Sequence, residues 1–262
     1  MTPETALEQS RRCQLATVGL DQPFLWLAHG WRDLLRAPLP GLLHGLAVSV
    51  FGLLLLGLAH RQFWLLAGAF SGFLLLGPLA ATGLYAVSRA LERGQRATLH
   101  TALAAWKPRD HRLVLFGLLL AAAGTGWVLT SASLITAFAP HPVRGPVDFL
   151  RVVVLDPRSW LFEGWLALGG VLAAPVYASS VVAMPLMLQR RIGVLAAVLT
   201  SWRVVLLNPA PMALWGALLM AITLLGMCTL LLGLIVAVPW LSYASWHAYR
   251  ALVPHAGLEE TG

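Results

Sequence analysis

The pattern of apolar and polar positions predicts an all-α polytopic membrane protein. A helix needs about 20 apolar residues to cross the hydrocarbon core of a bilayer. Six such runs can be drawn, at residues 41–59, 63–91, 113–139, 160–188, 211–228 and 230–252. The last two can also form one long helix that continues past Pro239, which would leave five spans.

Three amphipathic segments precede these runs, at residues 23–36, 97–107 and 193–207. In the first, Phe24, Leu27, Ala28 and Trp31 recur at the i, i+3, i+4, i+7 spacing of one helix face. We expect each segment to lie in the headgroup plane with this face in the acyl chains. The opposite face of the first segment, with His29, Arg32, Asp33 and Arg36, should then point toward the headgroups. The residues expected to anchor the three helices at the interface are Trp31, Arg32, Trp106, Lys107, Trp202 and Arg203.

An internal repeat favours six spans over five. WRDLLRAPLP at 31–40 and WRVVLLNPAP at 202–211 share their Trp, Arg and both Pro positions at an offset of 171 residues. The ends of the second and last runs, 73–91 and 233–252, align at an offset of 161. The earlier copy contains a two-span hairpin, so the later copy should also be a hairpin with shorter helices. A fainter third copy begins at residue 97, and the fold expected is three hairpins, each preceded by an interfacial helix.

The remaining segments frame a single transmembrane domain at residues 23–252. Residues 1–22 form a polar leader that lacks the basic-then-apolar order of a cleaved signal peptide. Residues 140–159 form an external loop, and residues 253–262 a C-terminal tail.

Composition and charge agree with lipid as the main solvent. Only 11% of the residues are charged and 58% are hydrophobic, against about 25% charged in a soluble domain. Of the 18 basic residues, all but Arg61, Arg144, Arg151 and Arg158 fall on the side of the N-terminus, which leaves 14 there. This bias predicts cytoplasmic N- and C-termini. It also explains the net charge of +7 without nucleic acid as a partner.

Three stretches carry a family resemblance: GPLAATGLYAVSRALERG at 77–94, SSVVAMP at 179–185 and SWHAYRALV at 245–253. They resemble an uncharacterised family of predicted six-span bacterial integral membrane proteins, a domain of unknown function. Some members are labelled putative cytochrome c oxidase subunit I. The resemblance implies about six spans and a bacterial inner-membrane location, and it supplies no catalytic residue. A haem–copper subunit needs more helices and several histidines at membrane depth, so the oxidase label does not suit this chain.

Two histidines lie within or near a span and could bind a cofactor. His44 and His247 are both placed toward the cytoplasmic side, where they could be axial ligands of a haem. The alternative is that each is an interfacial histidine bonded to a backbone carbonyl or a lipid headgroup. No metal site is expected, because Cys13 and Cys228 show no ligand spacing.

Prolines interrupt the returning spans at Pro78, Pro185 and Pro239. Proline removes a backbone donor and frees a carbonyl, which in transporters can bind substrates or ions. The tyrosines that could line such a polar pathway are Tyr85, Tyr177 and Tyr243. The alternative is a kink that helps the helices to pack. Gly164, Gly169 and Gly170 are candidates for close approach between helices.

No sequence motif indicates an enzyme. HExxH, Walker A, CxxC and Gly-x-Ser-x-Gly are all absent from the sequence. The leading expectation is a non-enzymatic accessory, assembly or scaffold subunit of a larger inner-membrane complex, such as a respiratory one. Its partners would be the lipid bilayer and either another membrane protein or further copies of itself. The alternatives are a small transporter or channel that uses the broken helices, and a haem- or cofactor-binding subunit.

Overall fold

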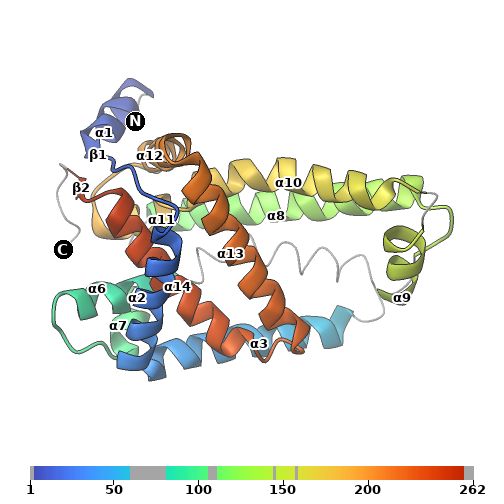
Figure 1. Cartoon of the computed structure of the whole chain (residues 1–262), viewed down its shortest axis with the longest axis horizontal. Helices are drawn as coiled ribbons and strands as arrows, with labels where there is room; N and C mark the ends of the chain where they lie inside the picture. Colours follow the sequence, from blue (N-terminus) through green and yellow to red (C-terminus); the bar gives the residue numbers. More distant parts are fainter. Residues whose placement is uncertain (1–2, 60–80, 106–110, 144–145, 157–158, 257–262) are drawn as a thin grey trace. The chain divides into compact units, whose positions relative to one another are not determined.

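The computed structural model describes residues 3–59, 81–105, 111–143, 146–156 and 159–256 (Figure 1). The described chain is almost wholly helical. Its α-helices are α1 (Pro3–Arg12), α2 (Gln22–Arg36), α3 (Pro38–Ala59), α6 (Thr82–Glu92), α7 (Leu99–Ala104), α8 (His111–Phe138), α9 (Pro146–Phe149), α10 (Leu161–Ser180), α11 (Ala183–Gln189), α12 (Val194–Leu207), α13 (Pro209–Cys228) and α14 (Leu234–Leu252). A π-helical turn, η1 (Leu150–Val154), follows α9, and two short strands, β1 (Cys13–Gln14) and β2 (His255–Ala256), pair antiparallel.

Four helical segments among the described residues are long and apolar enough to cross a membrane. They lie at Pro38–Leu55, His111–Phe138, Leu161–Gln189 and Pro209–Cys228. Between 22% and 44% of the residues in these windows are buried, so most of their apolar surface requires a non-aqueous surrounding. The expected all-α polytopic membrane fold is therefore confirmed, whereas the number of six spans stays a prediction. The second expected span, 63–91, lies mostly outside the described residues, and only its last part is seen as α6.

The chain divides into two compact units. The first comprises Met1–Val50, Pro78–Phe116 and Ala178–Gly262, and the second comprises Phe51–Gly77 and Gly117–Tyr177. In the second unit, Trp165 of α10 donates its Nε1–H to Ser131 Oγ of α8 at 2.6 Å. A Cβ at Gly169 would lie 3.0 Å from the ring of Trp127. Gly169 therefore allows the close approach that the sequence suggested.

Prolines explain where two of the helices end. Ala37 closes α2 at φ −133°, ψ 66°, and Asn208 closes α12 at φ −127°, ψ 54°. Each precedes a proline, and proline disfavours the helical conformation for the residue before it. Val253, which precedes Pro254 outside the proposed repeat, has nearly the same geometry, φ −128°, ψ 70°. The shared helix ends therefore follow from proline alone, and the internal repeat stays a prediction. The helices α3 and α13 start at Pro38 and Pro209, because proline is tolerated in a first turn.

The exposed surfaces of α2 and α12 also correspond at the offset of 171 residues. Leu35 and Leu206, which correspond at the offset of 171, are 65% and 71% exposed. Trp31 and Trp202 are exposed at the corresponding earlier position. Each helix thus carries an outward apolar stripe, as an interfacial helix would. The opposite side of α2 differs from the expectation, because Asp33 is buried rather than directed toward the headgroups.

A turn separates α13 from α14. Residues 229–233 leave the helix, and Leu230 and Leu231 adopt positive φ angles of 53° and 67°. Ser49 of α3 donates its hydroxyl proton to the carbonyl of Leu231 at 2.9 Å. The chain therefore reverses here instead of continuing as one helix through Pro239.

Close contact between α3 and α14 involves the proline inside α14. Pro239 cannot donate to the carbonyl of Ile235, one turn earlier. Gly45 of α3 lies against that carbonyl so closely that a Cβ would overlap it. Gly41 lies beside the ring of Pro239, where a Cβ would be 3.0 Å away. In this structure the freed carbonyl lies in a helix–helix contact.

The polar leader is docked on the first unit. Helix α1 packs against α12, and β1 pairs with β2 in the tail. Asn208 Nδ2 donates to the carbonyl of Ala16 at 3.0 Å, and its Oδ1 accepts from the amide of Val18 at 2.8 Å. Asn208, which directly precedes α13, thus holds residues 16–18 of the leader in place.

We predict that Gly45→Ala destabilises the protein, by about 1–3 kcal/mol, because the added methyl group must push α3 away from α14. Thermal unfolding in detergent and folded yield measure the effect. Gly126→Ala is the matched control, because a Cβ there would meet nothing within 4 Å. Equal stability of the two variants would contradict the contact.

Candidate functional site

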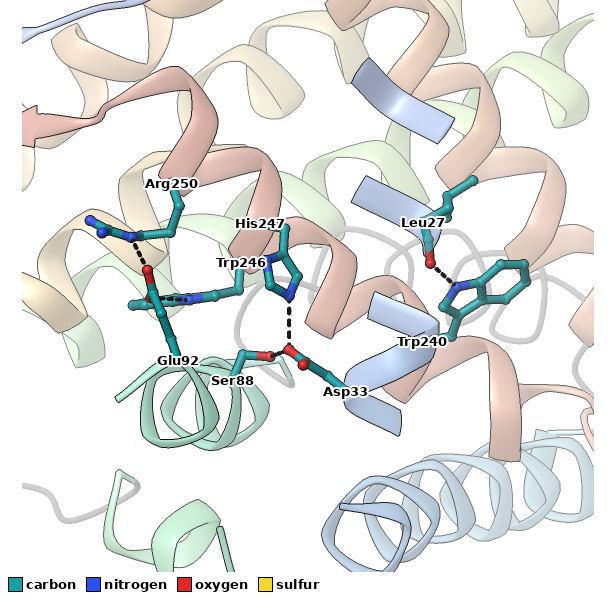
Figure 2. A network of polar contacts seen from close by, with 8 residues as sticks. All are labelled: Leu27, Asp33, Ser88, Glu92, Trp240, Trp246, His247 and Arg250. Atoms are coloured by element: carbon teal, nitrogen blue, oxygen red, sulfur yellow. Dashed lines mark hydrogen bonds and ion pairs between the residues drawn. The ribbon is translucent and has the colours of Figure 1, made fainter. Parts of the chain in front are cut away.

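A buried carboxylate lies where three helices of the first unit meet. Asp33 of α2 is 4% exposed, and it is the only acidic residue between Asp21 and Glu92. Its Oδ2 accepts the hydroxyl proton of Ser88 from α6 at 2.8 Å and lies 2.8 Å from Nε2 of His247 on α14 (Figure 2). We call Asp33, Ser88 and His247 the Asp33 cluster.

The sequence of α2 explains how this carboxylate comes to be inside. Trp26, Gly30 and Asp33 follow one another at i, i+4 and i+7 and therefore share a helix face. Gly30 allows α14 to approach, because a Cβ there would lie 2.5 Å from the backbone nitrogen of Ala244. His247 lies three residues further along α14, on the same side as Ala244. The close backbone contact thus sets the distance between the carboxylate and the imidazole.

Burial makes the partners of Asp33 necessary. An isolated buried carboxylate is strongly disfavoured, and hydrogen-bond donors or an opposite charge must compensate it. Ser88 supplies a hydroxyl, and His247 supplies an N–H that becomes an ion pair when the ring is protonated. Both donors meet the same oxygen of Asp33. In a hydrolase triad the serine would instead contact the histidine, so this geometry does not activate Ser88 as a nucleophile.

A second polar contact lies one turn further on α6. Glu92 accepts the indole N–H of Trp246 at 3.1 Å and the Nε–H of Arg250 at 2.9 Å (Figure 2). The side chains of Glu92 and Arg250 are 38% and 32% exposed, so the ion pair itself adds only about 0–1 kcal/mol. Trp240 of α14 donates to the carbonyl of Leu27 at 2.8 Å. Polar side chains of α14 therefore bind both α2 and α6.

His29 connects the Asp33 cluster to the outer surface of α2. Its ring centroid lies 5.2 Å from that of His247. Desolvation beside α14, together with the charges of His247 and Arg32, lowers the pKa of His29 below its usual 6.5, although Asp33 acts in the opposite direction. The surroundings of His29 therefore favour its uncharged form.

The histidines proposed as haem ligands are found on different helices. His44 of α3 has its Nδ1 3.1 Å from the carbonyl of Pro40, one turn earlier in its own helix. His247 has its Nε2 at Asp33. In both residues one ring nitrogen thus already has a protein partner, and haem binding stays a prediction. Among the described residues, no group of three or more His, Cys, Asp or Glu side chains could hold a metal ion.

The described residues proposed for a polar pathway are divided between the two units. Pro185 and Pro239 are buried, and Pro78 lies outside the described residues. Tyr85 and Tyr243 are buried in the first unit, where the Tyr243 hydroxyl donates to the carbonyl of Ala37 at 3.4 Å. Tyr177 belongs to the other unit. The use of these groups in transport stays a prediction.

The proposed interfacial anchors differ in their surroundings. Trp31 and Arg32 are exposed on α2. Trp202 is exposed too, and its indole donates to Ser179 Oγ at 2.9 Å. Arg203 is half-buried and donates to the carbonyl and hydroxyl of Ser10. Trp106 and Lys107 lie outside the described residues.

Sequence reasoning missed the role of Asp33 and did not single out Glu92. Two signals were available for Asp33: its isolation among acidic residues and its spacing from Trp26 and Gly30. Glu92 carried no such signal, because it lies just past the apolar run and looks like an ordinary solvated residue. Its partners, Trp246 and Arg250, are more than 150 residues away in the chain.

We predict that Asp33→Ala lowers the stability of the protein by about 1–3 kcal/mol, because Ser88 and His247 lose their acceptor. Thermal unfolding in detergent measures this loss. Asp21→Ala removes an exposed carboxylate at the start of the same helix and serves as the control. The assignment would fail if both variants unfolded at the same temperature as the wild type.

A pH series tests the environment of His29. The folded state binds this proton less tightly than the unfolded state, so stability should fall as the pH drops below about 6.5. His29→Gln, which cannot be protonated, should make the unfolding temperature fall less steeply between pH 7 and pH 5. A wild-type slope that this substitution leaves unchanged would show that His29 titrates normally.

Comparison with known protein families gives a match over part of the chain. Residues 65–189 match the family model described as "Predicted integral membrane protein (DUF2189)". The match confirms the resemblance to an uncharacterised membrane family. It says nothing about the number of spans or the oxidase label. No curated protein and no solved structure gives a significant match.

Proposed function

We propose that this integral membrane protein is non-enzymatic and acts by lateral association in the membrane. Its residues 65–189 are similar to the family described as "Predicted integral membrane protein (DUF2189)". It would serve as an accessory, assembly or scaffold subunit of a larger complex in the bacterial inner membrane. The side chains of the Asp33 cluster hydrogen-bond to one another and hold α2, α6 and α14 together. We therefore assign the function to the exposed surfaces of the helices.

The observation that carries the proposal is a stripe of small side chains on α8. We call this set the α8 stripe, and its members are Ala122, Gly126, Thr130, Ser133 and Ala137. All five are exposed, and their spacing of four and three residues puts them on one helix face. In membranes, helices associate where small residues let the backbones approach closely.

Two details make the α8 stripe suitable for a helix–helix contact. A Cβ at Gly126 would meet nothing within 4 Å, so the surface there is open for a second backbone. Thr130 donates its hydroxyl proton to the carbonyl of Gly126 at 2.8 Å, which satisfies the hydroxyl in an apolar surrounding. The large leucines Leu118 and Leu129, 62% and 63% exposed, lie near the stripe and would enlarge the contact.

The pairing of β1 with β2 supports the proposed topology. Cys13 is opposite Ala256, and Gln14 is opposite His255. The leader and the tail therefore lie on one side of the membrane, so the number of crossings between them is even. With the four crossings that the sequence predicts at residues 41–188, an even total supports two crossings at residues 211–252 rather than one. The charge bias assigns that side to the cytoplasm.

Substitution of the α8 stripe tests the proposal. The full-length protein is purified from its native membrane in mild detergent after cross-linking, and any stoichiometric partner is identified by mass. Gly126→Leu should reduce the recovered partner at least fivefold, whereas Gly126→Ala, which keeps a small side chain, should retain it. Gly170→Leu places the same bulk on α10, where a Cβ would also meet nothing within 4 Å, and controls for membrane insertion.

Two outcomes would contradict the proposed function. One is a protein that runs alone under mild detergent and cross-linking. The other is full recovery of the partner with Gly126→Leu. If the partner is a second copy of this chain, the association is homomeric and the scaffold role applies to the oligomer.

Reporter fusions test the topology. A reporter that is active only in the cytoplasm should be active when it follows residue 262 and when it precedes residue 1. Activity at one end alone would contradict the even number of crossings. Inactivity at both ends would reverse the assigned orientation.

A further inference from the structure

An open groove lies between the leader and α12. The leader contributes Arg11, Cys13 and Leu15 to its lining, and α12 contributes Arg203, Leu206 and Leu207. The groove has a volume of about 800 Å³, which is within the range of small-molecule sites. All of these residues belong to the first unit.

One part of the groove is positively charged. Arg11 is exposed at the end of α1, and Arg203 is half-buried. One nitrogen of Arg203, Nη1, donates to the carbonyl and hydroxyl of Ser10, and this holds the guanidinium in place. A guanidinium carries five N–H donors in a fork that suits a phosphate. Among the described residues, no acidic side chain lines the groove.

The other part of the groove is apolar and opens outward. Leu206 is 71% exposed and Leu207 is 45% exposed. Leu206 continues the apolar stripe of α12 that begins with Leu195 and Trp202, and Leu207 is its neighbour in the chain. An exposed tryptophan beside leucines and arginines is typical of the boundary between headgroups and acyl chains. The groove therefore joins a phosphate-binding end to a surface that suits hydrocarbon.

We propose that this groove binds an anionic glycerophospholipid, with the phosphate at Arg11 and Arg203 and the acyl chains along Leu206 and Leu207. The ligand would be held by two elements at once, the docked leader and α12. The site does not depend on the α8 stripe, which lies in the other unit. A negative result in the partner experiment would therefore not contradict the lipid site. A negative result in the lipid experiment would likewise not contradict the partner contact at the α8 stripe.

The test uses full-length protein in a neutral detergent with added phosphatidylglycerol or phosphatidylcholine, and native mass spectrometry counts the bound lipid. Wild type should bind phosphatidylglycerol more tightly than phosphatidylcholine. Arg11→Gln should weaken phosphatidylglycerol binding roughly fivefold, since one basic residue near an anionic surface contributes about that much. The matched control is Arg12→Gln, an exposed neighbour in the same helix that does not line the groove, and it should bind as wild type does.

A second pair of measurements distinguishes a lipid from a small anion. Leu206→Gln should also weaken phosphatidylglycerol binding, and inorganic phosphate at the same concentration as the lipid should not compete. Since Arg11 and Leu206 are exposed, their variants should unfold at the wild-type temperature. The proposal is overturned by equal binding of the two lipids, by equal effects of Arg11→Gln and Arg12→Gln, or by competition from inorganic phosphate with no effect of Leu206→Gln.

Discussion

The buried carboxylate of Asp33 is the constraint on which the first unit depends. A carboxylate inside a membrane protein must find donors, and here they come from two helices far away in the sequence, α6 through Ser88 and α14 through His247. This requirement fixes which helices are neighbours and how they are rotated. Gly30 and Gly45 then permit the backbone contacts that the carboxylate requires, with α14 lying against both α2 and α3.

The sequence predicted the elements better than their contacts. The apolar runs and the prolines gave α3, α8 and α13 to within about three residues, because lipid imposes a length on a helix and proline imposes its ends. The orientation of α2 could not be predicted in the same way. Its residues form two apolar stripes. The stripe with Trp26 and Leu34 is buried against protein, whereas the stripe with Trp31 and Leu35 is largely exposed, and its Trp31 touches protein at the ring of Trp240. Hydrophobicity does not distinguish a lipid-facing stripe from a protein-facing one, so Asp33 was assigned to the wrong side.

The contacts of the polar leader could not be predicted from the sequence either. The leader contacts Thr200, Arg203 and Asn208 through side-chain hydrogen bonds between residues about 190 positions apart. No periodic pattern in the sequence indicates such contacts. Docking of the leader places β1 beside β2 and creates the groove beside α12. The first unit thus has an interior organised by polar contacts. The two surfaces proposed to bind other molecules of the membrane are the α8 stripe in the second unit and the groove in the first.

A double-mutant cycle between Asp33 and His247 tests the central claim most directly. The free energies of unfolding of Asp33→Ala, His247→Ala and the double variant are compared with that of the wild type in the same detergent. If the carboxylate and the imidazole interact as described, the double variant loses less than the sum of the single losses, with a coupling energy of about 0.5–3 kcal/mol. Strict additivity of the two losses would contradict the account, because it would mean that the Asp33 carboxylate and the His247 imidazole do not stabilise each other.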